Sequence, residues 1–158
     1  SEFNEDNNLD VLLAGVHFVS NSSGHVIRKF LPGGFTSWKM HFGLMPPHPG
    51  AFIHHNVYKK VGIFDTSFSI AGDFDLFVRV FMKNNFNYKK IDRIAVNMTL
   101  GGVSTLGLQS YAIITREVSR SLTQNGFFGS KLLISCRGFF KLLQFTTRFG
   151  SKTKKPNS

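Results

Sequence analysis

Cysteine is nearly absent from this chain of 158 residues, in which Cys136 is the only one. A single cysteine excludes an internal disulfide and a cysteine-based zinc site, and it is typical of a reducing compartment. Long apolar runs are missing as well, because no stretch reaches the roughly 18 apolar residues of a membrane-spanning helix. We therefore expect a cytoplasmic protein without a transmembrane helix.

Acidic residues are the other scarcity, since nine Asp and Glu stand against 19 Lys and Arg, for a net charge of +10. The charge is graded: −4 over residues 1–15 (four acids, no base), +6 over 16–104 (ten bases, four acids) and +8 over 105–158 (nine bases, one acid). A basic C-terminal segment indicates an anionic partner such as phosphate, nucleic acid or lipid headgroups, or else a solvated face that keeps the protein soluble. With 42% hydrophobic residues, the chain is expected to fold rather than to remain disordered.

Several common catalytic signatures are also missing. The sequence contains no Walker A motif, no G-x-G-x-x-G fingerprint, no G-x-S-x-G nucleophile motif and no histidine pair spaced for a zinc protease. These absences exclude the enzyme classes that depend on those motifs. The scarce acids therefore become the first candidates for chemistry.

Apolar periodicity and turn residues predict a mixture of strands and helices. The predicted strands are Val11–Val19, Val26–Ile27 (the second arm of a hairpin), Ala51–Ile53, Tyr88–Ile91 and Ile94–Leu100. The predicted helices are His55–Val61, ended by a left-handed Gly62, Ile70–Asn85, a helix from Ser104 or Thr105 to Gly126, and Lys131–Phe149. The proline-rich stretch 31–49 is predicted as an extended loop. This pattern indicates an α/β fold with a helical C-terminal appendage.

Two of the nine acids, Asp73 and Asp75, lie at the start of the strongest predicted helix. Residues i and i+2 of a helix point to different sides, so the two carboxylates are not expected to share one role or one metal ion. Asp75 is expected to form an i, i+4 ion pair with Arg79. For Asp73 two interpretations stay open, the N-cap of the helix or a carboxylate that faces a cleft. Glu117 is predicted on a later helix beside Arg120.

Two further segments are candidates for ligand contact. His48 lies between Pro47 and Pro49, which restrict its backbone, so it is either aimed at a ligand or packed within a loop. The sequence Gly101-Gly102-Val103-Ser104 either brings backbone N–H groups and a hydroxyl to a ligand or forms only a turn.

Taken in order along the chain, five segments resemble the second half of a glycosyltransferase family 2 domain, the inverting GT-A type of bacterial polysaccharide synthesis. The segments are Met45–Pro49, Ala51–Ile53, Tyr58–Asp65, Ile70–Leu76 with Arg79, and Gly101–Ser104. The resemblance covers roughly residues 9–105. It implies a Rossmann-like, mixed-sheet GT-A fold, of which this chain supplies the C-terminal half.

The resemblance also implies roles for individual residues. The second half of such a domain supplies the acceptor site and the catalytic base, and Asp73 matches the acid of the family's E/A-D-x-D-L stretch. Gly72 departs from this pattern, because many members carry Glu or Ala there. Asp73 is thus implied as the base that deprotonates the acceptor hydroxyl. The implied substrate-binding residues are His48, Asp75, Arg79, Gly101, Gly102 and Ser104.

The nucleotide-binding half of the family is missing from the sequence, since nothing before Val11 resembles it and no earlier D-x-D occurs. The expected divisions are a remnant or linker over 1–8, the acceptor-side half over 9–105, a basic helical extension over 106–150 and a disordered tail over 151–158. The complete enzyme is expected to use a divalent cation, Mg²⁺ or Mn²⁺, with ligands largely in the missing half. No metal site is predicted in this chain, which alone is expected to be inactive.

The implied partners are a nucleotide-sugar donor and a glycan or lipid-linked acceptor. The basic, Phe-rich helix Lys131–Phe149 either lies against the inner face of the plasma membrane or packs on the domain. An alternative function is a non-catalytic basic module that binds nucleic acid or an anionic membrane surface. Because the Phe residues follow core spacings and no RNA-binding signature occurs, no nucleic acid is expected. A degenerate domain retained for partner binding is a third alternative.

Overall fold

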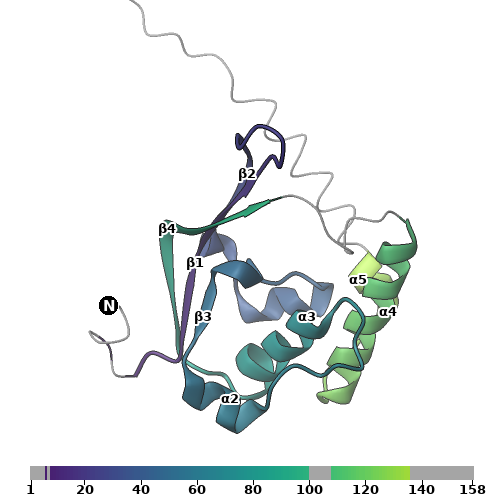
Figure 1. The fold of residues 1–158 in the computed structure, drawn as a ribbon. Helices are drawn as coiled ribbons and strands as arrows, with labels where there is room; N and C mark the ends of the chain where they lie inside the picture. Colours follow the sequence, from purple (N-terminus) through teal and green to yellow (C-terminus); the bar gives the residue numbers. More distant parts are fainter. Residues whose placement is uncertain (1–5, 7, 100–107, 136–158) are drawn as a thin grey trace, which may run out of the picture.

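The computed structural model describes residues 6, 8–99 and 108–135, and it shows a mixed α/β fold with one four-stranded sheet (Figure 1). The strands are β1 (Val11–Val19), β2 (Val26–Phe30), β3 (Ala51–Ile53) and β4 (Tyr88–Thr99). β1 pairs antiparallel with β2 and β3 along one edge and parallel with β4 along the other. The predicted α/β class, the hairpin and the strand at 51–53 are confirmed.

β4 corrects the prediction of two separate strands at 88–91 and 94–100. It is one strand, and its register against β1 shifts on both sides of Gly15. The extra residues of β4 are taken up as irregularities in the ladder instead of forming a turn. Gly15 suits this crowded position, because a Cβ there would lie 2.7 Å from the Leu31 side chain and 2.8 Å from that of Ile94.

The predicted helix 70–85 is shorter and changes its winding. It begins at Gly72 as α3 (Gly72–Phe77) and continues directly into a π-helical segment, η4 (Val78–Lys83). Its apolar stripe is buried as predicted, and the stripe consists of Phe74, Phe77, Val78 and Phe81. α2 (His55–Val61) is confirmed, but Gly62 ends it with φ +82° and ψ 176°, a glycine conformation other than the predicted left-handed one.

The stretch 31–49 is more structured than the predicted extended loop. It contains η1 (Pro32–Gly34) and η2 (Ser37–Phe42), and it leads into η3 (His48–Gly50). Prolines occupy the first turns of η1 and η3, where the absent N–H costs nothing, so they start short 3₁₀ turns as well as restricting the residues before them.

The last two described helices are α4 (Leu108–Gln124) and α5 (Lys131–Ser135). α4 packs on α3, and α5 contacts both α4 and η2. The core lies between the sheet and these helices, with Leu13, Met40, Phe77, Leu122 and Ile134 fully buried. The predicted start of α4 and the predicted continuation of α5 to Phe149 lie outside the described residues. None of the described helices is long and apolar enough to cross a membrane.

Candidate active site

The structure brings His48 and Asp73 together, although β3 and α2 separate them in the chain. Nδ1 of His48 lies 3.9 Å from Oδ2 of Asp73. This separation is an ion-pair distance when the imidazole is protonated and is too long for a hydrogen bond. The side chains are 38% and 28% exposed, so both reach solvent. The pair is therefore accessible to a substrate hydroxyl.

Two phenylalanine rings flank the His48 imidazole. The centroid of Phe64 lies 5.9 Å away with its ring nearly perpendicular, and the centroid of Phe77 lies 5.7 Å away. Phe77 is fully buried in α3, and His48 begins η3 directly after Pro47. These contacts place apolar rings beside the imidazole, whose Nδ1 faces Asp73.

Asp73 is not the N-cap of α3, which removes one of the two interpretations left open by the sequence. The N-cap position is held by Ala71, and Asp73 lies inside the first turn. Oδ1 of Asp73 accepts a hydrogen bond of 2.8 Å from the N–H of Phe74, whereas Oδ2 faces His48. One carboxylate oxygen of Asp73 is thus directed at the candidate site.

Glu117 of α4 takes the role that a capping residue would have. Its carboxylate accepts three successive backbone N–H groups just before α3, from Ser69 (2.8 Å), Ile70 (2.9 Å) and Ala71 (2.8 Å). α3 begins at Gly72, so Glu117 supplies acceptors for the N–H groups that immediately precede the helix and that no earlier turn could bond. This contact between distant segments fixes the entry of the helix that carries Asp73.

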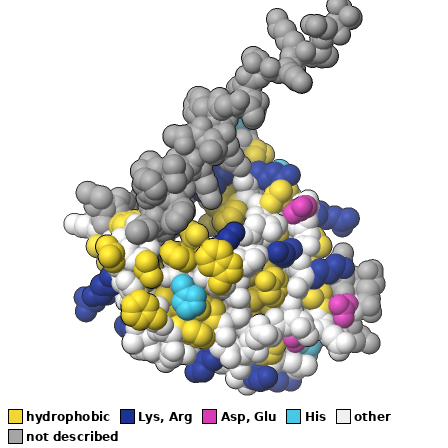
Figure 2. Space-filling view, turned by 180° about the vertical axis from the view of Figure 1, so that it is seen from behind, with side chains coloured by type: hydrophobic (Ala, Val, Ile, Leu, Met, Phe, Trp, Pro, Cys, Tyr) yellow, Lys and Arg dark blue, Asp and Glu magenta, His cyan; other side chains and the backbone are white. Residues whose placement is uncertain are grey.

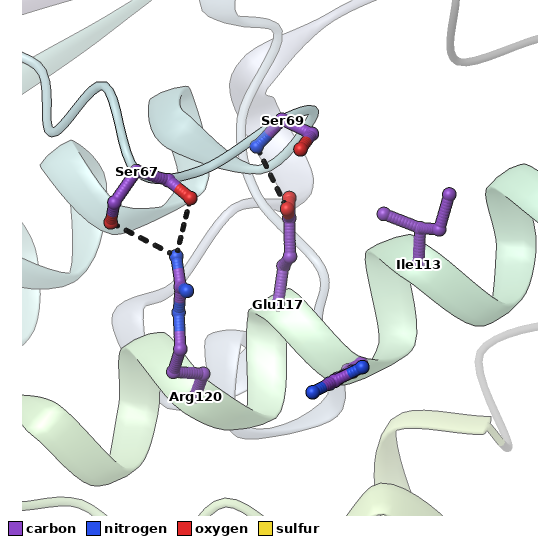
Figure 3. A pocket seen from close by; sticks show the side chains of 6 residues that line it. Ser67, Ser69, Ile113, Glu117 and Arg120 are labelled. Carbon is purple, nitrogen blue, oxygen red and sulfur yellow. Dashed lines mark hydrogen bonds between the residues drawn. The ribbon is translucent and has the colours of Figure 1, made fainter.

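Arg120 supports the same loop one turn further along α4. Its Nη2 donates to both the carbonyl and the hydroxyl oxygen of Ser67, at 3.1 and 3.2 Å, and its guanidinium lies 3.9 Å from the centre of the Phe68 ring. Figure 3 shows Glu117 pointing from α4 toward Ser69 and Arg120 pointing toward Ser67. Together these contacts border a surface hollow of about 350 Å³, whose lining does not include Asp73. We place the candidate site at Asp73 because its carboxylate is solvent-accessible and faces the imidazole of His48.

Replacing Glu117 by glutamine is expected to lower the free energy of unfolding by roughly 2–4 kcal/mol at pH 7, because charge-assisted bonds are lost and N–H groups of buried backbone stay unpaired. Burial raises the pKa of the Glu117 carboxyl, but the N–H donors of Ala71, Ser69 and Ile70, with Arg120, outweigh burial and hold this pKa below its usual value. Urea denaturation of both proteins at several pH values measures the effect.

The pH dependence of this substitution has a definite sign. A carboxyl whose pKa is lower in the folded than in the unfolded protein stabilises the fold above the unfolded pKa, and this stabilisation is lost as the pH falls through the folded pKa. The difference between Glu117 and its Gln variant is therefore expected to shrink below about pH 4. Arg116→Ala, a neighbouring exposed position on α4, serves as the control and should change stability by less than about 0.5 kcal/mol. A pH-independent difference would contradict this account.

Asp75 and Arg79 form the predicted i, i+4 ion pair, but the pair is buried. Nε of Arg79 lies 2.9 Å from Oδ2 of Asp75, and the Asp75 residue is only 4% exposed. The other oxygen of Asp75 accepts Ser121 Oγ at 2.8 Å and Asn125 Nδ2 at 3.1 Å, both from the α4 end of the molecule. Asp75 thereby joins α3 to α4 inside the fold.

The guanidinium of Arg79 binds the end of α2. Its Nη1 donates to the carbonyl oxygens of Val61 (2.6 Å) and Gly62 (3.3 Å), and its Nη2 donates to that of Ile63 (3.0 Å). These bonds satisfy C-terminal carbonyls of the helix and hold the segment that leads to Phe64. Asp75 and Arg79 therefore hold together the elements next to the candidate site. Their implied contact with substrate stays a prediction.

Burial is the main influence on the acidity of Asp73. Partial burial raises the pKa of the Asp73 carboxyl above its usual value, while the charge of His48 and the N–H groups of Phe74 and of Asp73 itself oppose this rise. A carboxylate with a raised pKa is a stronger proton acceptor than an ordinary one. The geometry thus suits proton removal from a neutral hydroxyl.

The remaining predicted site residues, Gly101, Gly102 and Ser104, lie outside the described residues. In residues 6, 8–99 and 108–135, no three His, Cys, Asp or Glu side chains come together in a group that could hold a metal ion. Sequence analysis missed the roles of Glu117, Ser121 and Asn125. The one available signal for Glu117 was that it is the only acid among the bases of the C-terminal third.

No family model, no curated protein and no solved structure matches the chain.

Proposed function

We propose that residues 9–105 are the acceptor-side half of an inverting family 2 glycosyltransferase of GT-A type. The observation that carries this proposal is the pairing of His48 with Asp73, which lies in the first turn of α3 next to residues that Glu117 holds in place. The mixed sheet is compatible with the GT-A fold. The order of segments from Met45 to Ser104 adds the resemblance to that family.

In the proposed reaction, Asp73 is the general base. Its carboxylate takes the proton of an acceptor hydroxyl as the hydroxyl oxygen attacks the anomeric carbon of the donor sugar. The new carbon–oxygen bond forms on one face, and the bond to the nucleoside diphosphate breaks on the opposite face, so the configuration inverts. The imidazole of His48, when protonated, stabilises the ionised form of Asp73.

The acceptor in this proposal is a glycan or a lipid-linked glycan, and the donor is a nucleotide-sugar. Enzymes of this type use Mg²⁺ or Mn²⁺, but the described residues do not fit such a site because they contain no group of three metal-ligating side chains. We assign the cation to the nucleotide-binding half, which we expect outside these 158 residues. No step performed by Asp73 or His48 passes through it.

The coding sequence upstream of Ser1 tests the proposal. We expect it to encode a nucleotide-binding half with a D-x-D motif. A protein that contains both halves should transfer sugar from nucleotide-sugars to glycan acceptors, whereas this chain alone should not. Sugar transfer by the 158-residue chain without a companion would contradict the division into halves, and an upstream region without a nucleotide-binding half would contradict the family.

A further inference from the structure

An exposed apolar surface is formed by two segments that lie far apart in the sequence. Trp38 of η2 is 59% exposed, and Phe128, Leu132 and Leu133, from α5 and the turn before it, are 76%, 77% and 38% exposed. We call these four residues the Trp38 surface. Hydrophobic side chains gather in one area of the face that Figure 2 presents. A surface of this kind needs a partner if it is large and continuous.

The two segments of the Trp38 surface are held together by contacts beneath it. α5 packs against η2, and the rings of His41 and Phe127 lie 5.9 Å apart, nearly perpendicular to each other. Ile134 of α5 is fully buried and anchors this short helix in the core. Trp38 packs edge-on against Phe42, with 5.9 Å between the ring centroids. These contacts therefore hold the exposed side chains of η2 and α5 next to one another.

Basic residues lie beside the Trp38 surface and continue in the sequence that follows it. Lys131 is exposed at the start of α5, and Lys39 follows Trp38 in η2. The sequence after Ser135 holds six further bases and no acid: Arg137, Lys141, Arg148, Lys152, Lys154 and Lys155. Exposed aromatic and aliphatic side chains in a basic part of the sequence are the composition of segments that bind anionic lipid bilayers.

We propose that the Trp38 surface docks on an anionic lipid membrane, with Trp38, Phe128 and Leu132 entering the headgroup region. The sequence predicted membrane contact only for Lys131–Phe149, and the structure adds η2 to the contact. This surface uses neither Asp73 nor a donor-binding half. Its test is therefore independent of the proposal for sugar transfer.

Trp38 is the only tryptophan, so the fluorescence of the unmodified chain reports on this surface alone. Vesicles rich in phosphatidylglycerol are expected to shift the emission to shorter wavelength and to protect Trp38 from acrylamide quenching. Pure phosphatidylcholine vesicles should bind at least about tenfold more weakly, and added salt should weaken the binding to anionic vesicles by a similar factor. Equal binding to both vesicle types, or no spectral change with either, would overturn the proposal.

Matched substitutions distinguish binding through the Trp38 surface from nonspecific binding through other exposed apolar residues. Leu132→Gln and Phe128→Gln should each weaken binding to phosphatidylglycerol vesicles by about tenfold, because each removes an exposed apolar side chain from the contact. Ile27→Gln, on the 58% exposed Ile27 of β2, should have no such effect. Equal losses for all three variants would overturn the proposal. A blue shift that grows with protein concentration in the absence of vesicles would overturn it as well, in favour of a second copy as the partner.

Discussion

Replacing Asp73 with asparagine is expected to lower the turnover of sugar transfer by about 10²–10⁴-fold in a protein that joins this chain to its nucleotide-binding half. Asparagine keeps the size and the hydrogen bond to the N–H of Phe74 but has no carboxylate to accept the proton. The KM for the nucleotide-sugar should change little, because Asp73 is proposed to act on the acceptor. Steady-state kinetics with each substrate varied in turn measures both quantities.

Stability provides the control for this substitution. The raised pKa means that protonated Asp73 fits the fold better than ionised Asp73, so its contribution to stability is present at low pH and is lost as the pH rises through the folded pKa. Asp73→Asn should consequently unfold at an equal or higher denaturant concentration at pH 7. Unchanged turnover in a stable variant would remove Asp73 as the base.

Replacing Asp75 with alanine is expected to lower the free energy of unfolding by about 3–5 kcal/mol, the largest effect on stability among these variants. The substitution leaves the Arg79 guanidinium buried without its counter-charge and removes the acceptor for Ser121 and Asn125. Such a loss is a large part of the roughly 5–15 kcal/mol that stabilise a typical domain. Guanidinium chloride denaturation followed by circular dichroism measures it.

Two further variants make the Asp75 result specific. Asp92→Ala removes an exposed acid of β4 and should cost less than about 0.5 kcal/mol. Arg79→Met combined with Asp75→Ala should cost less than Asp75→Ala alone, because no unpaired charge is left largely buried. If Asp75→Ala costs no more than Asp92→Ala, the buried network does not hold α3 to α4.

Helices and strands whose formation depends on residues close together in the sequence could be predicted. A run of β-forming apolar residues predicted Val11–Val19, turn residues predicted the hairpin that follows it, and the i, i+3, i+4, i+7 spacing predicted the buried side of α3 and η4. Their boundaries were less accurate where tertiary contacts decide them. The residues just before α3 bond to the carboxylate of Glu117, 46 to 48 positions later in the chain, and no local pattern predicts this contact.

For the candidate site, too, local features could be predicted and long-range contacts could not. The i, i+4 spacing gave the pair Asp75–Arg79, but not the burial of the pair or its bonds to Ser121 and Asn125 of the α4 segment. The prolines around His48 indicated a restricted side chain, and only the fold shows that it points at Asp73. Long-range pairing of this kind depends on how the helices pack on the sheet, and this packing is not encoded in any short window.

The pKa of the Asp73 carboxyl, measured in this chain by ¹³C NMR titration, tests most directly whether Asp73 is tuned as a base. The account predicts a pKa above that of an ordinary aspartate, because burial disfavours the charged form. Replacing His48 by glutamine should raise this pKa further, since the positive charge of His48 opposes the effect of burial. A pKa at or below the ordinary value, unchanged by His48→Gln, would contradict the account.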